Sequence, residues 1–202
     1  MNSLFVLHDS PRFVAPLLAD IHLRPTLLAS CKIISSALCQ VAPNEIQIKR
    51  NSDGAKEHNY KKITLIPPYP RENSWVLWVA KSYYHFWWIV ETAWNTDKEL
   101  SYRFSTSQSN FYLKLSKLVE EGIARHFPKP DYKKVSNWPA TFPIIGGEIN
   151  SHRQNYKKLP VRMKWTNRET PEFFKDAFSC PKCFAIRPVS VCDDSFCYYS
   201  QN

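Results

Sequence analysis

Apolar positions recur at helical spacing along most of this chain, and the pattern predicts a mainly helical protein. A first short helix is expected to begin at Ser10, a favourable cap, and to end near Pro16 or Asp20. A second helix is expected over residues 25–39, where Pro25 suits the first helical position and apolar side chains repeat at intervals of three and four. Both predictions rest on periodicity together with a start signal.

The most aromatic segment runs from residue 73 or 74 to Trp94, and its rings occupy nearly every face of a helix drawn through it. Because a helix that is apolar on all faces belongs in the interior, this segment is expected to form the centre of the fold. Asn95 is expected to stop it, and the capping box at residues 96–99 is expected to begin another helix that reaches Phe104.

The remaining segments are shorter. Residues 109–126 predict an amphipathic helix, and residues 43–70 predict a loop-rich insertion with one short strand at residues 63–66. The proline-rich segment over residues 128–143 predicts a loop. A last helix is expected to begin at Thr170 and to end before the C-terminal cysteines.

The predicted fold is therefore an all-α domain over residues 1–178 with a tryptophan-rich central helix, followed by a small zinc-binding module over residues 179–202. No stretch is apolar enough for a membrane span, so no membrane partner is expected. The opening apolar run is too short for a signal peptide, which favours the cytoplasm. Cys31 and Cys39 lie in an apolar segment and are interpreted as small core residues.

Four cysteines close to the C-terminus have the spacing C-x2-C-x8-C-x4-C. They are Cys180, Cys183, Cys192 and Cys197. Four thiolates from one short segment can surround a tetrahedral zinc ion and leave no open position for water, which is typical of a structural site. The alternatives are two disulfides in a secreted protein, or unlinked thiols.

The net charge of +9 and the isoelectric point of about 9.3 favour an anionic partner, with nucleic acid first among the candidates. Basic residues gather between residues 149 and 168, where Tyr156 and Trp165 alternate with them. The predicted nucleic-acid contacts are Arg24, Arg153, Lys157, Lys158, Arg162, Lys164, Trp165 and Arg168. The alternative is a solvated basic face with both aromatic rings turned inward.

Five short segments, in consistent order over about residues 1–175, carry a family resemblance. They are residues 2–7, 20–22, 78–88, 99–104 and 165–174. They resemble a group of small, mostly viral proteins that is distantly similar to the phage pyrimidine-dimer DNA glycosylases, the endonuclease V family. The resemblance implies a helical DNA-binding fold, in a host-cell cytoplasm if viral. In active members of the family an N-terminal amine attacks the sugar and a glutamate assists.

The sequence departs from that family at the positions that carry its chemistry. Ala29 stands where the resemblance places the glutamate, and Ala80 stands where it places an arginine. A retained Met1 displaces the amine by one residue. The expectation is therefore a DNA-binding protein without the glycosylase and lyase reaction, in which any remaining activity is base excision. The alternative is a viral interaction protein whose zinc tail and exposed aromatic side chains bind a host or viral protein.

A few polar residues remain as candidates for catalysis. Asp20, His22 and Arg103 are the weak catalytic candidates, and Glu99 accompanies them. The favoured interpretation of Asp20 and His22 is helix capping, and Glu99 with Arg103, four residues later, is interpreted as a surface ion pair. His85, among aromatic residues, is interpreted as a core or boundary histidine.

Overall fold

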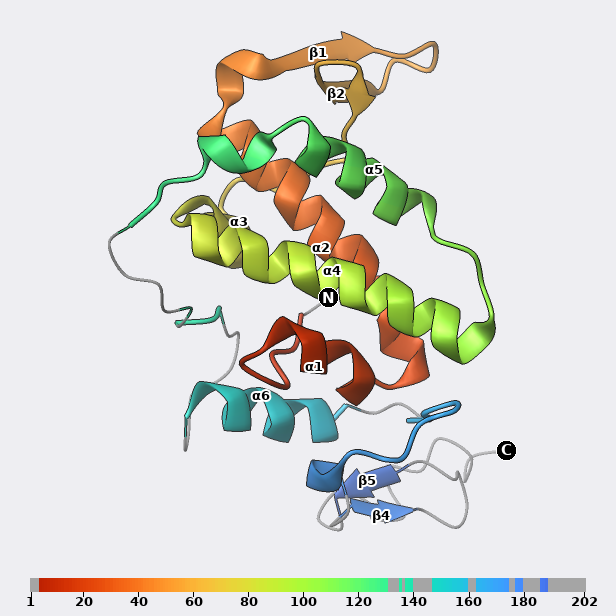
Figure 1. Cartoon of the computed structure of the whole chain (residues 1–202). Helices are drawn as coiled ribbons and strands as arrows, with labels where there is room; N and C mark the ends of the chain where they lie inside the picture. Colours follow the sequence, from red (N-terminus) through yellow and green to blue (C-terminus); the bar gives the residue numbers. More distant parts are fainter. Residues whose placement is uncertain are drawn as a thin grey trace.

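The computed structural model describes residues 4–130, 135, 137–139, 147–159 and 163–174, together with the backbone of residues 177–179 and 186–188. This part of the chain is mostly helical, with two small antiparallel sheets (Figure 1). The helices are α1 (Pro11–Leu17), α2 (Asp20–Val41), α3 (Ser74–Ala80), α4 (Tyr83–Phe104), α5 (Asn110–Glu120) and α6 (Glu148–Lys157). The strands are β1 (Ile46–Arg50), β2 (Lys56–Tyr60), β3 (Ile63–Thr64), β4 (Ala177–Ser179) and β5 (Ile186–Pro188), and short 3-10 turns span Pro43–Glu45, Ile123–His126 and Glu172–Phe174.

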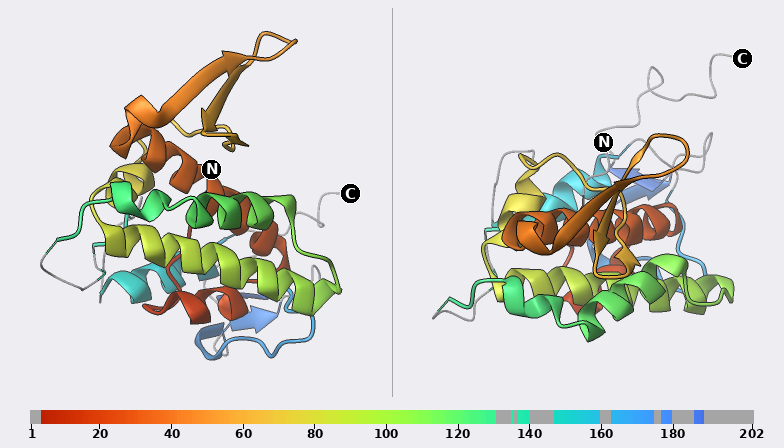
Figure 2. Two further views of the ribbon diagram at one scale, coloured as in Figure 1. Left: turned by 45° about the horizontal axis from the view of Figure 1, so that its top comes forward. Right: turned by 90° about the horizontal axis from the view of Figure 1, so that it is seen from above.

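Helix α4 lies at the centre and packs against α1, α2 and α3 (Figure 1). Helix α5 runs back along α4, as the views of Figure 2 also show. The extended residues 4–7 are buried within this helical body, with Val6 and Leu7 fully inaccessible. Trp88 of α4 donates its indole N–H to the carbonyl of Asp9 at 2.7 Å, which fixes the chain between that buried segment and α1. The tryptophan-rich centre is thus confirmed as the middle of the core.

The single helix predicted from residue 74 to Trp94 is wrong, because the chain breaks between α3 and α4. Ser82 adopts an extended conformation, and its hydroxyl accepts the N–H of Tyr84 as an N-cap. The N–H of Tyr83 donates to the carbonyl of Pro128 at 2.7 Å, a contact from a distant segment. A serine among apolar residues marked this break, but its effect depends on the partner that Pro128 supplies.

The predicted stop at Asn95 is also wrong, since α4 continues without interruption to Phe104. Three polar side chains in this stretch bond back to the carbonyl four residues earlier: Thr92 to Trp88 at 2.8 Å, Asn95 to Glu91 at 2.7 Å and Thr96 to Thr92 at 2.7 Å. Side chains of this kind begin or end helices when their oxygen or amide faces the free backbone groups at a terminus. Here the buried environment of α4 keeps them inside the helix.

Helix α2 begins at Asp20, five residues before the predicted start at Pro25. Pro25 therefore lies inside the helix, where it removes one backbone hydrogen bond. The early start has partners elsewhere in the chain, because the N–H of Asp20 donates to the carbonyl of Lys164 at 2.8 Å. The N–H of Ala19 donates to the hydroxyl of Tyr156 at 2.7 Å. A local signal could not reveal either bond.

The segment expected to be loop-rich forms a three-stranded antiparallel sheet in the order β1, β2, β3. Strands β1 and β2 form a hairpin whose turn is held by Asn51, since its side-chain oxygen accepts the N–H of Asp53 at 3.2 Å and of Ala55 at 2.8 Å. Gly54 supplies the positive φ of 76° that this turn needs. The sheet projects from the helical body (Figure 2). In β1 only Ile46 and Ile48 alternate with polar residues, and this alternation is too short to identify a strand.

Two further helix predictions were wrong in extent or position. The amphipathic helix over residues 109–126 ends as α5 at Glu120, and Gly122, with φ of 76°, leads into a 3-10 turn. The last helix expected from Thr170 is a single 3-10 turn over Glu172–Phe174, whereas α6 was not predicted. Residues 135 and 137–139 of the expected proline-rich loop have no regular structure, and most of that loop lies outside the described residues.

Candidate functional site

The start of α2 is the place where residues from three distant parts of the chain meet. Asp20 and His22 lie in its first turn, Arg103 and Glu99 come from the end of α4, and residues 163–168 run alongside. The structure thus brings together all four polar candidates that the sequence singled out, and it adds partners that the sequence did not indicate.

Arg103 is the centre of this group, and its side chain is completely buried. Its guanidinium donates to the carboxylates of Glu99 at 2.7 Å and Asp20 at 2.9 Å. It also donates to the backbone carbonyls of Leu18 at 2.9 Å and Pro16 at 3.0 Å. These carbonyls lie at the end of α1, where the helix has no internal donors for them. Arg103 therefore joins α1, α2 and α4, and its donors are directed at protein groups.

Glu99 lies between two arginines. Its carboxylate accepts from Arg103 and from the Nε and Nη2 atoms of Arg168, the latter at 2.8 and 2.9 Å. Burial alone raises the pKa of Glu99, but the hydrogen bonds from Arg168 and Arg103 outweigh it and hold that pKa below its ordinary value. The same bond to Glu99 raises the pKa of Arg168, whose guanidinium lies 4.3 Å from the ring centre of Tyr102.

The prediction that Glu99 and Arg103 form a surface ion pair is wrong about its location, because the pair is buried. The side chain of Glu99 is 5% exposed and that of Arg103 is 0% exposed. The spacing of four residues was interpreted correctly as an ion pair, but the face of α4 that carries it packs against α1 and the chain around Thr166 rather than facing water. Periodicity did not place this face inside, because both residues are charged.

Asp20 accepts hydrogen bonds from Thr166 as well as from Arg103. The backbone N–H of Thr166 donates to both carboxylate oxygens at 3.0 and 3.1 Å, and its hydroxyl donates at 2.7 Å. Burial raises the pKa of Asp20, but the bonds from Arg103 and Thr166 more than compensate and lower it. Asp20, Arg103, Glu99 and Arg168 thus alternate in sign and balance one another in charge. We call this group the ion network.

His22 lies beside the ion network and contacts Tyr156 of α6. The Nδ1 atom of His22 is 2.8 Å from the hydroxyl oxygen of Tyr156. That oxygen also accepts the N–H of Ala19, so the hydroxyl of Tyr156 joins α6 to the start of α2 and to His22. Burial lowers the pKa of His22 to about 4 and raises that of Tyr156, so neither side chain is charged near neutral pH.

Four of the eight predicted nucleic-acid contacts keep cationic groups without an ion pair among the described residues. Arg24, Lys158 and Lys164 are exposed and Lys157 is half-buried. They lie in segments that meet near the start of α2: Lys157 and Lys158 follow Tyr156, whose hydroxyl accepts the N–H of Ala19, and the carbonyl of Lys164 accepts the N–H of Asp20. Arg24 lies about one turn along α2. We call these four side chains the cationic surface.

Three of the other four predicted contacts have internal partners. Arg153 donates from Nε to the carbonyl of Leu7 at 2.8 Å, and its guanidinium lies 5.2 Å from the ring centre of Phe173. Arg168 belongs to the ion network. Arg162 lies outside the described residues.

Trp165 is 7% exposed, its indole N–H donates to the carbonyl of Leu17 at 3.2 Å, and its ring lies 5.1 Å from that of Phe174. Tyr156 is fully buried. Both rings of the basic segment therefore face inward, as the alternative interpretation expected, and neither presents a face on which a base could stack. The sequence could not show whether these rings are exposed or buried. Alternating aromatic and basic residues occur both on surfaces where bases stack and in segments whose aromatic side chains pack into the core.

The positions at which the sequence departs from the glycosylases lie in the helical body. Ala29 is 2% exposed within α2, and Ala80 ends α3. His85 is buried as expected, with Nδ1 2.8 Å from the carbonyl of Trp78 and its ring stacked at 4.0 Å on that indole. His152 is also buried, and burial lowers its pKa to about 4. It adds no positive charge to the cationic surface at neutral pH.

The four C-terminal cysteines lie outside the described residues. Within those residues, no group of three histidine, cysteine, aspartate or glutamate side chains is arranged to hold a metal ion. Cys31 is buried and Cys39 half-buried, and neither forms a disulfide. None of the described helices is long and apolar enough to cross a membrane.

Thr166 and Tyr102 are the partners that the sequence did not indicate. Thr166 anchors Asp20 from a segment that predicts no regular structure, and Tyr102 packs under Arg168 while its hydroxyl donates to the carbonyl of Asn167 at 3.1 Å. A signal for Tyr102 existed, since it directly precedes Arg103, but its partner is 65 residues away.

Comparison of the chain with protein-family models, with curated proteins and with solved structures found no match.

Proposed function

We propose that this protein binds nucleic acid, duplex DNA in the first place, through phosphate contacts made by the cationic surface. The observation that carries the proposal is that three segments carrying Arg24, Lys157, Lys158 and Lys164 meet near the start of α2, and that none of these cations has an ion pair among the described residues. The net charge of +9 supports the same partner.

The ion network supports this role by fixing two of these segments, α2 and the chain around Lys164, against α4. Asp20 binds Thr166, and Glu99 binds Arg168, so the chain that carries Lys164 is attached to both α2 and α4. Lysine side chains contact phosphates as flexible point charges, and their backbone must be fixed if several are to act together. The network itself has no net charge, and its donors are used within the protein.

The proposed function is binding without the glycosylase and lyase reaction. Asp20 and Arg103, two of the three weak catalytic candidates, are bonded to each other and to other protein groups. Ala29 offers no carboxylate at the position that the resemblance assigns to the catalytic glutamate. Trapping with borohydride on duplex DNA that carries an abasic site is expected to yield no covalent adduct, and an adduct would restore the enzymatic interpretation.

The binding test compares two variants that each remove four positive charges. One replaces Arg24, Lys157, Lys158 and Lys164 with glutamine, and the matched control replaces four exposed cations of the sheet region. The control residues are Lys49, Arg50, Lys56 and Lys62. Affinity for a short duplex is measured by fluorescence anisotropy over a range of salt concentrations.

Each phosphate contact contributes about −0.9 to the slope of log K against log salt. Loss of four contacts should therefore flatten the slope by about 3.6 in the first variant. The control should retain most of the slope. Equal losses in the two variants would show that only overall charge matters and would overturn the cationic surface.

The C-terminal segment supports a second proposal, a structural zinc site formed by Cys180, Cys183, Cys192 and Cys197. Strand β4 pairs with β5 so that Ser179 lies opposite Ile186, which brings together the two ends of the segment that contains Cys180 and Cys183. Two cysteines in the connection of a short hairpin suit adjacent corners of a zinc tetrahedron. A module of this kind would present a surface for a protein partner, which is the alternative function.

A further inference from the structure

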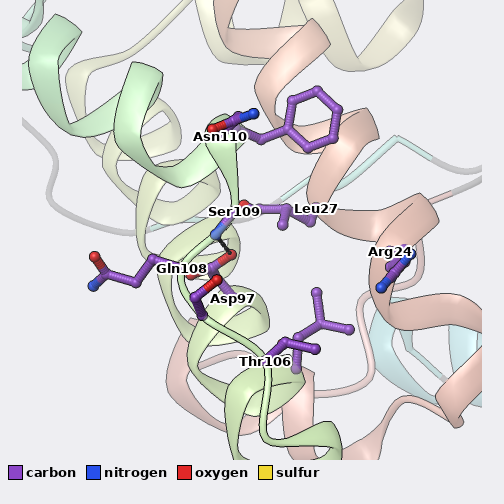
Figure 3. A pocket seen from close by; sticks show the side chains of 10 residues that line it. Arg24, Leu27, Asp97, Thr106, Gln108, Ser109 and Asn110 are labelled. Atoms are coloured by element: carbon purple, nitrogen blue, oxygen red, sulfur yellow. Dashed lines mark hydrogen bonds between the residues drawn. The ribbon is translucent and has the colours of Figure 1, made fainter.

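A pocket of about 460 Å³ opens between α2, the last turns of α4 and the chain that enters α5 (Figure 3). Its size lies within the range of small-molecule sites. Leu27, Leu100 and Phe111 contribute apolar walls, and the polar groups come from Arg24, Asp97 and residues 106–110. The pocket is separate from the ion network, because none of the four charged residues of that network lines it.

Asp97 is the unusual residue of this pocket. It is 2% exposed, and its Oδ1 atom accepts the backbone N–H of Ser109 at 3.1 Å. Among the described residues no lysine, arginine or histidine nitrogen lies within 4.0 Å of its carboxylate, in contrast to Asp20 and Glu99, which each bind arginine. A buried carboxylate without a cationic partner is costly, and such groups are concentrated at binding sites.

The negative charge of Asp97 affects its surroundings. Burial, with the charge of Asp97 as a second cause, raises the pKa of Cys31 to about 12 and keeps that thiol neutral. The N-terminus of α5, at which Ser109 is the cap, lies beside the carboxylate and favours its negative charge. This wall of the pocket therefore attracts a cation.

Arg24 supplies the opposite charge on the opposite wall. Figure 3 shows its side chain on α2, across the pocket from Asp97 and Ser109. It is exposed and has no ion pair among the described residues. The guanidinium is always charged and binds carboxylates through two parallel hydrogen bonds. Leu27 and Leu100 line the same pocket.

We propose that this pocket binds a small zwitterion, namely a free α-amino acid with an apolar side chain. The ammonium group donates to the carboxylate of Asp97, the ligand carboxylate accepts from Arg24, and the side chain contacts Leu27, Leu100 and Phe111. An ammonium has three donors and no acceptor, which complements a carboxylate with an oxygen to spare. This site shares Arg24 with the cationic surface, but Asp97, Leu27, Leu100 and Phe111 take no part in the proposed DNA binding, and the site is tested without DNA.

The test uses the full chain and three probes that differ by one charged group. L-Leucine carries both charges, 3-methylbutylamine lacks the carboxylate and 4-methylpentanoate lacks the amine, while all three have the same branched end. Binding is measured by calorimetry and by saturation-transfer NMR. Leucine is expected to bind at least about tenfold more tightly than either fragment, since each charge-assisted contact contributes about a factor of ten.

Two variants and a control assign the contacts. Asp97→Asn keeps an oxygen for the N–H of Ser109 but removes the charge, so it should fold normally and lose about tenfold or more in leucine affinity. Arg24→Gln should lose a similar factor, and Arg12→Gln, an exposed arginine of α1, should lose none. The proposal is overturned if leucine does not bind at about 20 mM, if the three probes bind equally, or if Asp97→Asn binds as the unmodified protein does.

Discussion

Replacing Arg103 with methionine should destabilise this protein more than any other single change in the ion network. Methionine keeps much of the length and the apolar character of the side chain, but it supplies none of the donors. The substitution leaves Asp20 with Thr166 alone and leaves the carbonyls of Pro16 and Leu18 without their donor. Removing one partner of a buried ion pair costs about 3–5 kcal/mol.

The loss should be visible as a fall in melting temperature of roughly 6 to 20 °C, because 1 kcal/mol corresponds to about 2–4 °C in a chain of this size. Unfolding in urea is followed by circular dichroism and by the fluorescence of the seven tryptophans. Arg168→Gln is the matched control: its side chain is 37% exposed and Glu99 retains Arg103, so a loss of about 1 kcal/mol or less is expected.

A double-mutant cycle separates the ion pair from simple packing. Adding Asp20→Asn to Arg103→Met removes the carboxylate that lost its cation, so part of the stability should return, with a coupling of about 1–3 kcal/mol. The reasoning is refuted if Arg103→Met costs no more than Arg168→Gln. It is also refuted if the two substitutions at Arg103 and Asp20 are additive.

Two further predictions concern pH and metal. Because the folded pKa of His152 is about 4 and the ordinary value is 6.5, the unfolded chain binds the proton more readily, so stability present above about pH 6.5 declines as the pH falls toward 4. His152→Gln should reduce by about 1–2 kcal/mol the stability lost between pH 7 and pH 5, measured by urea unfolding at both values, and an unchanged loss would contradict this assignment. Protein purified without added metal should contain about one zinc per chain by elemental analysis, and folded, metal-free protein with two disulfides would contradict the zinc proposal.

Local signals predicted those elements whose start and apolar face are encoded together. The helix from Pro11 follows Ser10 as expected, and α5 follows Ser109, whose hydroxyl accepts the N–H of Tyr112 at 3.1 Å. Leu115 and Leu118 of α5 are buried, as expected of an amphipathic helix, whereas Phe111 of the same helix is 36% exposed. In these segments the sequence pattern and the tertiary contacts agree, so periodicity is sufficient.

The same signals were wrong where a distant residue determines the outcome. Polar Thr96 resembled a helix start but is fully buried inside α4, and Ser82 lay in a continuous apolar run but caps a new helix. Helix α6 escaped prediction because its few buried residues are a serine, a histidine and a tyrosine, whose burial has no periodic apolar signature.

For the candidate site too, some features could be predicted from the sequence and others depend on tertiary contacts. The amino-acid sequence alone determined that the chain is basic, mainly helical and centred on a tryptophan-rich segment, because charge and periodicity are properties of local sequence. It also singled out Asp20, Glu99 and Arg103. Only the tertiary structure decided that these residues form a buried network, that Trp165 faces inward and that no cation of the described part of the chain lies beside Asp97. Those outcomes depend on contacts between residues more than 60 positions apart, where burial and pairing, not residue type, decide what a charged side chain does.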